Sequence, residues 1–131
     1  ITSSGGYYLT NGLIKNKTIK KLYFDNNILN DNGLNSIINV LIQNNTHITE
    51  LSLSNNQLTT DNLLTLAEFI SSCKTLVYID ISSNTVDESS AEKLGNSLIN
   101  SSLKILKAKK CNLNDKTLNL LVITYHFTKK T

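Results

Sequence analysis

The chain has 131 residues, of which 40% are hydrophobic, and its formal net charge at pH 7 is +3. This length and apolar content suit a single globular domain, and no apolar run reaches the roughly 18–20 residues of a membrane-spanning helix. All thirteen basic residues are lysines, which argues against bidentate phosphate recognition and against an arginine finger.

The first predicted element is a helix within residues 1–17. Its residues match those of a later predicted helix at one constant offset along the chain. The matched pairs are Ile1 with Leu29, Gly5 with Gly33, Leu9 with Ile37, and Leu13 with Leu41. We therefore interpret residues 1–17 as the helical half of a repeat whose strand is missing, and the chain as a fragment of a longer protein.

A short strand follows, and its pattern returns three times along the chain. In the first copy, Ile19, Leu22 and Phe24 precede Asn27 and Leu29. The later copies are Ile48, Leu51, Leu53, Asn56 and Leu58, then Leu76, Ile79, Ile81, Asn84 and Val86, then Leu103, Leu106, Ala108, Cys111 and Leu113. Apolar and polar residues alternate within each copy, as in a half-buried strand. The first positions of the copies are almost evenly spaced, so four strands are predicted in one frame.

The ninth position of each copy is asparagine or cysteine. A buried asparagine there can bind backbone groups of the turn, which would each cost roughly 1–3 kcal/mol if left unpaired. Cys111 takes this place in the fourth copy, where a thiol is a weak donor but is small and easily buried.

A helix is predicted after each strand, because apolar residues recur at spacings of three and four. These residues are Leu34, Ile37, Ile38 and Leu41, then Leu63, Leu66, Ala67 and Ile70, then Ala91, Leu94 and Leu98, then Leu118, Leu121, Val122 and Tyr125. An aspartate lies near each predicted helix start, where a carboxylate can cap free N–H groups. The four aspartates are Asp31, Asp61, Asp87 and Asp115.

The frame L-x-x-L-x-L-x-x-N/C-x-L, with a period of about 28 residues, resembles the ribonuclease-inhibitor-like leucine-rich repeat family over nearly the whole chain. The resemblance implies an α/β solenoid, a horseshoe segment with short parallel strands on the concave face and helices on the convex face. We expect one domain, 1–131, with the helical half-repeat at 1–17 and full repeats at 18–46, 47–74 and 75–101. Residues 102–131 hold the last repeat, followed by a C-terminal cap or the run-in to a further unit.

On such a solenoid, the third, fifth, seventh and eighth positions of each copy line the concave face. These positions are Lys21, Tyr23, Asp25 and Asn26, then Glu50, Ser52, Ser54 and Asn55, then Tyr78, Asp80, Ser82 and Ser83, then Ile105, Lys107, Lys109 and Lys110. The candidate partner-binding residues among them are Lys21, Tyr23, Asp25, Glu50, Ser52, Tyr78, Asp80, Ile105, Lys107, Lys109 and Lys110.

Two features of this set invite interpretation. Tyrosine is enriched in interface hot spots, but Tyr23, Tyr78 and the apolar Ile105 could equally cover neighbouring strands. The run Lys107–Lys110 contains three lysines and lies away from the aspartates of the set. This cluster could dock an acidic partner, or it could be a charged edge that keeps a terminal strand from pairing with other chains.

The fold and this surface predict a non-enzymatic protein–protein interaction module that binds its partner through the concave face. One alternative is a GTPase-activating protein of the leucine-rich repeat type that acts through Asn26, Asn55 or Asn84. Another is a sensor or scaffold segment of a larger receptor, cytoskeletal regulator or microbial effector. We expect no cofactor and no metal.

Catalysis and nucleic-acid binding find little support in the sequence. His47 and His126 are not paired with a nucleophile or carboxylate at a recognisable spacing, and no nucleic-acid motif is present. Cys73 and Cys111 form neither a disulfide framework nor a metal-site spacing. Without cysteine-rich caps, we expect an intracellular (cytoplasmic) protein, or one delivered into a host cytoplasm if it is a microbial effector.

Overall fold

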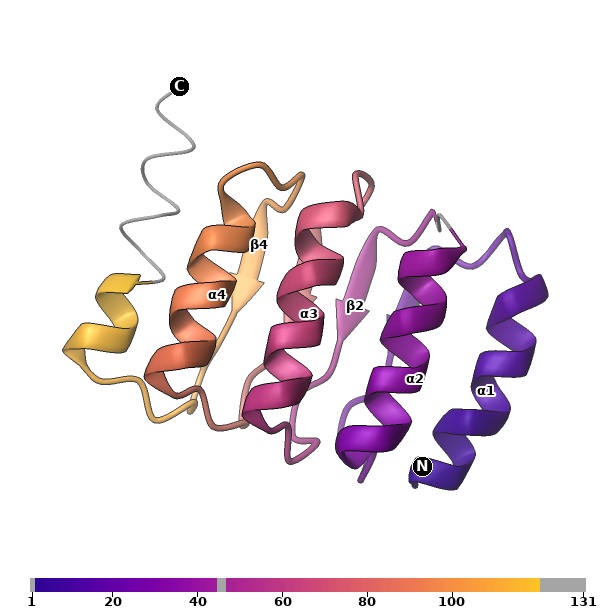
Figure 1. Cartoon of the computed structure of the whole chain (residues 1–131), viewed down its shortest axis with the longest axis horizontal. Helices are drawn as coiled ribbons and strands as arrows, with labels where there is room; N and C mark the ends of the chain where they lie inside the picture. The colour runs from indigo at the N-terminus through magenta and orange to yellow at the C-terminus, as the bar shows by residue number, and fades with distance from the viewer. Residues whose placement is uncertain (1, 45–46, 121–131) are drawn as a thin grey trace.

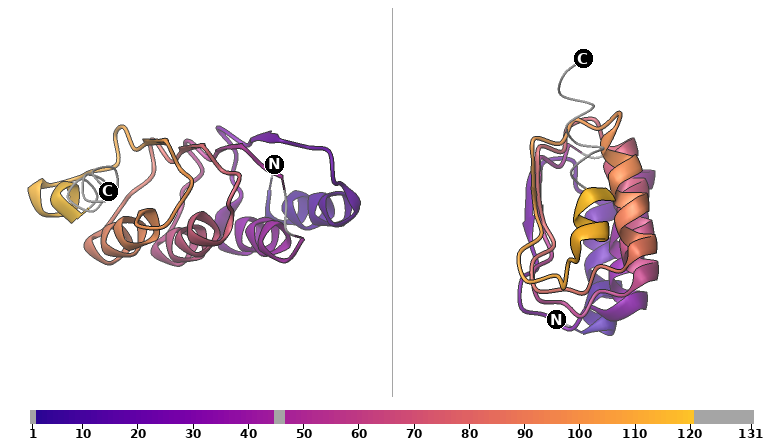
Figure 2. Two further views of the ribbon diagram at one scale, coloured as in Figure 1. Left: turned by 90° about the horizontal axis from the view of Figure 1, so that it is seen from above. Right: turned by 90° about the vertical axis from the view of Figure 1, so that its left-hand side faces the viewer.

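The computed structural model describes residues 2–44 and 47–120, in which helices and strands alternate. The elements are α1 (Ser3–Lys15), β1 (Lys21–Tyr23), α2 (Asn30–Gln43), β2 (Glu50–Ser52), α3 (Thr60–Ser72), β3 (Tyr78–Asp80), α4 (Glu88–Leu98) and β4 (Ile105–Lys107). A further helical segment covers residues 115–120. The helices form one layer and the strands form a second layer beside it (Figure 1, Figure 2). The predicted α/β class is confirmed, with strand–helix units that repeat along the chain.

The four strands form a parallel sheet in the order β1-β2-β3-β4. Lys21 pairs with Glu50, Glu50 pairs with Tyr78, and Tyr78 pairs with Ile105. Strands of successive units therefore lie side by side, which confirms the register predicted from the spacing of the four copies. Equivalent positions of successive units form rows across the sheet.

The core lies between the two layers. From the strand side, Leu51, Leu53, Ile79 and Ile81 are fully buried, and from the helix side Leu34, Leu63, Leu66 and Leu94 are fully buried. No unit could bury this apolar surface alone, so stacking of neighbours builds one continuous core.

Two core assignments at the ends of the stack are wrong. Ile19 is 37% exposed and Leu118 is 45% exposed. Both belong to the outermost described units, where a neighbouring unit covers them on one side only. Leu121, Val122 and Tyr125, which were assigned to the same helix as Leu118, lie outside the described residues, as does the stretch considered as a cap.

The asparagines at the ninth position bind backbone groups of the turn, as predicted, and Asn56 and Asn84 also connect adjacent units. The side-chain amide of Asn84 donates to the carbonyl oxygens of Leu53, Ile81 and Ser82 at 3.0, 2.9 and 3.1 Å. Its Oδ1 accepts from the backbone N–H groups of Asn56 and Leu58 at 3.1 and 3.0 Å.

The other ninth positions repeat parts of this arrangement. Asn56 donates to the carbonyl oxygens of Phe24 and Ser54 at 2.7 and 3.2 Å. The thiol of Cys111 donates to the carbonyl oxygens of Ile81 and Lys109 at 3.3 and 3.5 Å. In the second, third and fourth units, the ninth position therefore connects the turn after the strand to the unit before it. In the first unit, Asn27 donates to the carbonyl oxygens of Phe24 and Asp25, in its own unit, at 2.8 and 3.0 Å.

The helix caps follow the aspartate prediction only in part. Asp87 is the N-cap of α4 and accepts from the Ser90 N–H at 2.8 Å. Hydrogen bonds from the Ser90 and Thr60 hydroxyls lower the pKa of the Asp87 carboxyl. This interaction therefore stabilises the fold above the unfolded pKa and is lost as the pH falls through the folded pKa.

Two of the other aspartates are not caps. In α3, Thr59 is the N-cap and Asp61 lies in the first turn. Before residues 115–120, the Oδ1 of Asn114 accepts from the Thr117 N–H at 2.8 Å, so Asn114 caps this segment in place of Asp115. The side chain of Asp31 lies outside the described part of the structure.

α1 and α2 pack closely at Gly6, which has no side chain. A Cβ atom added there would lie 2.9 Å from the Cα and 3.0 Å from the carbonyl oxygen of Gly33. We expect Gly6→Ala to lower the free energy of unfolding by about 1–3 kcal/mol, because backbone must move to relieve the overlap.

The matched control is Gly12→Ala in the same helix. A Cβ at Gly12 meets nothing within 4 Å, so we expect this change to stabilise the protein by roughly 0.5–1 kcal/mol. Denaturant unfolding of both variants measures the difference. Equal stability of the two would mean that α1 does not pack on α2 through Gly6.

Candidate functional site

The candidate site is the surface of the sheet that faces away from the helices, which we call the sheet face. Two rows of paired positions form it: Lys21, Glu50, Tyr78 and Ile105 in the first, and Tyr23, Ser52, Asp80 and Lys107 in the second. Asp25, Lys109 and Lys110 follow their strands by a few residues. The structure thus brings the predicted residues together on neighbouring strands or directly after them, although they come from four separate parts of the chain.

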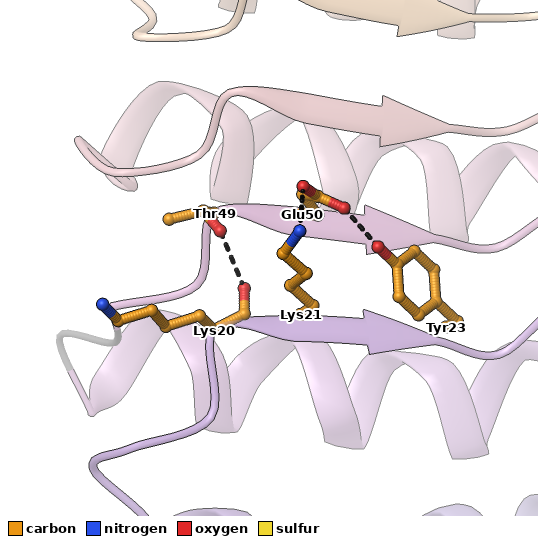
Figure 3. A network of polar contacts seen from close by, with 5 residues as sticks. All are labelled: Lys20, Lys21, Tyr23, Thr49 and Glu50. Atoms are coloured by element: carbon orange, nitrogen blue, oxygen red, sulfur yellow. Dashed lines mark hydrogen bonds and ion pairs between the residues drawn. The ribbon is translucent and has the colours of Figure 1, made fainter.

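At the β1 end of the sheet face, three side chains form a polar cluster that we call the Glu50 cluster. The Lys21 Nζ lies 2.7 Å from the Glu50 Oε1, and the Tyr23 hydroxyl donates a hydrogen bond to the Glu50 Oε2. Lys21 and Tyr23 come from β1 and reach across to Glu50 on β2, in front of the helix layer (Figure 3). The Glu50 carboxylate therefore binds both Lys21 and Tyr23.

These contacts shift the pKa values of all three groups. Hydrogen bonding to Glu50 raises the pKa of Lys21 and also that of Tyr23. The hydrogen bonds from Lys21 and Tyr23 lower the pKa of Glu50. The cluster consequently keeps its charged lysine and carboxylate together at neutral pH, and the pairing is lost as the pH falls through the folded-state pKa of Glu50.

The cluster predicts a specific effect of removing one hydroxyl. We expect Tyr23→Phe to raise the pKa of Glu50 toward its ordinary value, because the carboxylate loses one of its two hydrogen-bond donors. Side-chain carboxyl NMR signals followed against pH measure this shift. Tyr78→Phe is the control and should leave the Glu50 titration unchanged, since the Tyr78 hydroxyl is hydrogen-bonded to Asp80. An unchanged Glu50 pKa in Tyr23→Phe would contradict the pairing.

Asp25, which follows β1, and Asp80 on β3 both accept hydrogen bonds from nearby groups of the chain. Asp25 accepts from the Ser52 hydroxyl and, at 3.0 Å, from the Ser54 N–H. Ser52 is only 4% exposed, so its prediction as a solvent-facing contact residue is wrong. The hydrogen bond to Asp25 and the small size of serine hold it within the surface. Asp80 similarly accepts from the Ser82 N–H at 2.8 Å.

At the β4 end, exposed apolar and basic groups lie side by side. Ile105 is 50% exposed, and it pairs in register with the half-buried Tyr78. The ammonium group of Lys107 lies 5.5 Å from the centre of the Tyr78 ring, a cation–π contact.

Lys107, Lys109 and Lys110 are all exposed, and we call them the lysine patch. Among the described residues, the ion pairs are Lys21–Glu50 and Lys116–Glu88, neither of which involves the patch. Lys110 has a φ of 55°. The residues at the same eighth position of the other units, Asn26, Asn55 and Ser83, also have positive φ. The patch therefore begins on β4 and ends in the turn that follows it.

The cysteines and histidines were the other groups considered for chemistry. Cys73 and Cys111 are free and buried, and burial raises the pKa of the Cys111 thiol. His47 lines one small pocket together with Cys73, a proximity that the spacing in sequence did not reveal. The Cys73 thiol donates to the Ile48 carbonyl oxygen at 3.7 Å. His126 lies outside the described residues.

Within residues 2–44 and 47–120, no group of three or more His, Cys, Asp or Glu side chains is arranged to hold a metal ion. No helix in this part of the chain is both long enough and apolar enough to cross a membrane. Comparison with known proteins adds no further assignment, because no protein-family model and no curated protein match this sequence.

Proposed function

We propose that this chain is part of a leucine-rich repeat solenoid of the ribonuclease-inhibitor-like kind and that it binds a partner protein through the sheet face. The supporting observation is the set of exposed or half-exposed Tyr23, Tyr78 and Ile105 side chains on a sheet whose other face is packed against helices (Figure 2). Strands held in register lose little conformational entropy on binding, so a broad surface can bind without a pocket.

The alternatives have less support. GTPase activation would need an accessible asparagine, and the amide of Asn84 is buried and bound to three backbone carbonyl groups. Asn26 and Asn55 are exposed, and Asn55 donates to Asn26 at 3.0 Å, so these two amides are accessible but contact each other. A sensor or scaffold role within a larger protein is compatible with the same binding surface. The two free cysteines suit a reducing, intracellular compartment.

The test compares two triple variants of the same composition. The sheet-face variant carries Tyr23→Ser, Tyr78→Ser and Ile105→Ser. The control carries Tyr7→Ser, Tyr8→Ser and Ile14→Ser on α1, where the three side chains are 61%, 73% and 47% exposed. We expect affinity capture to recover a partner protein with the native chain and the control, and to lose it with the sheet-face variant.

Circular dichroism should confirm that both variants retain the native fold. A partner held by the sheet-face variant but lost by the control would assign binding to the helices and contradict the proposal.

A further inference from the structure

We propose that the β4 end of the sheet face is the docking end, and that its occupant is an acidic peptide segment of a partner protein that also carries an apolar side chain. This inference rests on the proposed function, since it assumes that the sheet face binds a protein. It adds which end of the face binds and what chemistry the partner has.

The charged groups at the β1 end already have partners within the molecule. Glu50 accepts from both Lys21 and Tyr23, so an incoming charged group would compete with an existing ion pair and an existing hydrogen bond. Asp25 is likewise occupied by the Ser52 hydroxyl and the Ser54 N–H. A partner would gain little charge complementarity at this end, because each of these charged groups has a protein partner.

The β4 end has the opposite character. None of the lysine-patch residues forms an ion pair within the described part of the chain. Asp80 is paired in register with Lys107, so the expectation that the lysines lie away from the aspartates is wrong for Asp80. Its carboxylate binds the Ser82 N–H and the Tyr78 hydroxyl and forms no ion pair with Lys107. Carboxylates from outside the molecule are therefore the complementary groups for the lysine patch.

The apolar part of the partner follows from Ile105 and Tyr78. Ile105 is 50% exposed on the outermost strand, and the Tyr78 ring beside it is in contact with Lys107. An apolar side chain placed on Ile105 would remove this surface from water while neighbouring carboxylates reach the lysines. The four strands span about 14 Å at a spacing of roughly 4.8 Å, so an extended peptide of about five residues crosses the whole sheet.

Nucleic acid fits this surface less well. The cation of Lys107 already lies over the Tyr78 ring, which leaves that ring less free to stack on a base. The patch has three lysines and the chain has no arginine, so phosphate contacts would be few and without bidentate geometry.

The experiment selects peptides from a displayed library of random short sequences on the immobilised native chain. Binding of the selected peptides is then measured by fluorescence anisotropy. The test variant carries Lys107→Glu, Lys109→Glu and Lys110→Glu. The control carries Lys15→Glu, Lys20→Glu and Lys93→Glu, three exposed lysines outside the patch, and it has the same net charge as the test variant.

We expect the selected peptides to be rich in Asp and Glu, to contain at least one large apolar residue, and to lose at least about tenfold in affinity for the test variant but not for the control. Peptides without acidic bias that lose affinity only for the Tyr23, Tyr78 and Ile105 triple variant would overturn the acidic-partner inference and leave the proposed function standing.

Two further outcomes are decisive. Peptides that bind the native chain and every sheet-face variant equally would overturn both proposals. A fluorescein-labelled single-stranded RNA that binds the native chain as tightly as the best peptide, and loses affinity for the test variant, would identify nucleic acid as the occupant.

Discussion

Asn84→Leu is expected to lower the free energy of unfolding by at least about 3 kcal/mol, because each buried backbone group left without a partner costs roughly 1–3 kcal/mol. The side chain of Asn84 makes five hydrogen bonds to backbone groups, and leucine can make none of them. Denaturant unfolding followed by circular dichroism measures the loss.

The chain itself supplies the control for this change. Cys111 occupies the ninth position in the fourth unit, where its thiol donates to the Ile81 carbonyl oxygen. Asn84→Cys should therefore be less destabilising than Asn84→Leu, because a thiol keeps a donor and is easily buried. If leucine were tolerated as well as cysteine, the asparagine would not anchor the turn to the preceding unit.

Ile81→Ala is expected to cost about 2–5 kcal/mol of stability, because truncation removes apolar contacts and leaves a cavity. Ile81 is fully buried between the sheet and the helices. The same substitution at Ile28, which is 56% exposed, should change stability by less than about 0.5 kcal/mol. Thermal and denaturant unfolding of the two variants test the assignment, and a similar loss at both positions would contradict the described core.

The repeat frame predicted what depends on backbone periodicity. The nearly even spacing of the four copies placed Lys21, Glu50, Tyr78 and Ile105 in one row, and the sheet has this register. Burial of the strand residues and the turn-binding role of Asn56 and Asn84 followed from the same frame. These features could be predicted from a single sequence because the same pattern occurs in each of the four units.

Features that depend on individual side chains were not predictable in this way. Ser52 on β2 is buried and donates a hydrogen bond to Asp25, which follows β1, and no spacing encodes this contact. To predict the Glu50 cluster, one would need to know which neighbouring side chain Lys21 and Tyr23 each approach. Asp61 has a carboxylate and lies in the first turn of α3, but Thr59 is the N-cap, because the capping residue must lie just outside the helix.

The ends of the stack show a further limit. Ile19 occupies the same frame position as the buried Ile48 and yet is 37% exposed. Periodicity assigns both to the core, but Ile19 precedes β1, an edge strand of the described sheet, so its frame position alone does not determine its burial. The close approach of α1 and α2 at Gly6 likewise results from the packing of two helices and not from either helix alone.

Partner binding at the sheet face, and at its β4 end in particular, predicts which residues a bound peptide affects. The most direct measurement is a titration of the isotope-labelled chain with the tightest acidic peptide from the selection, followed by backbone amide NMR signals. We expect the changes to concentrate on residues 78–80 and 105–110, with the outer surfaces of α2, α3 and α4 unaffected. Changes confined to the helices, with the amides of β3 and β4 unmoved, would contradict the account.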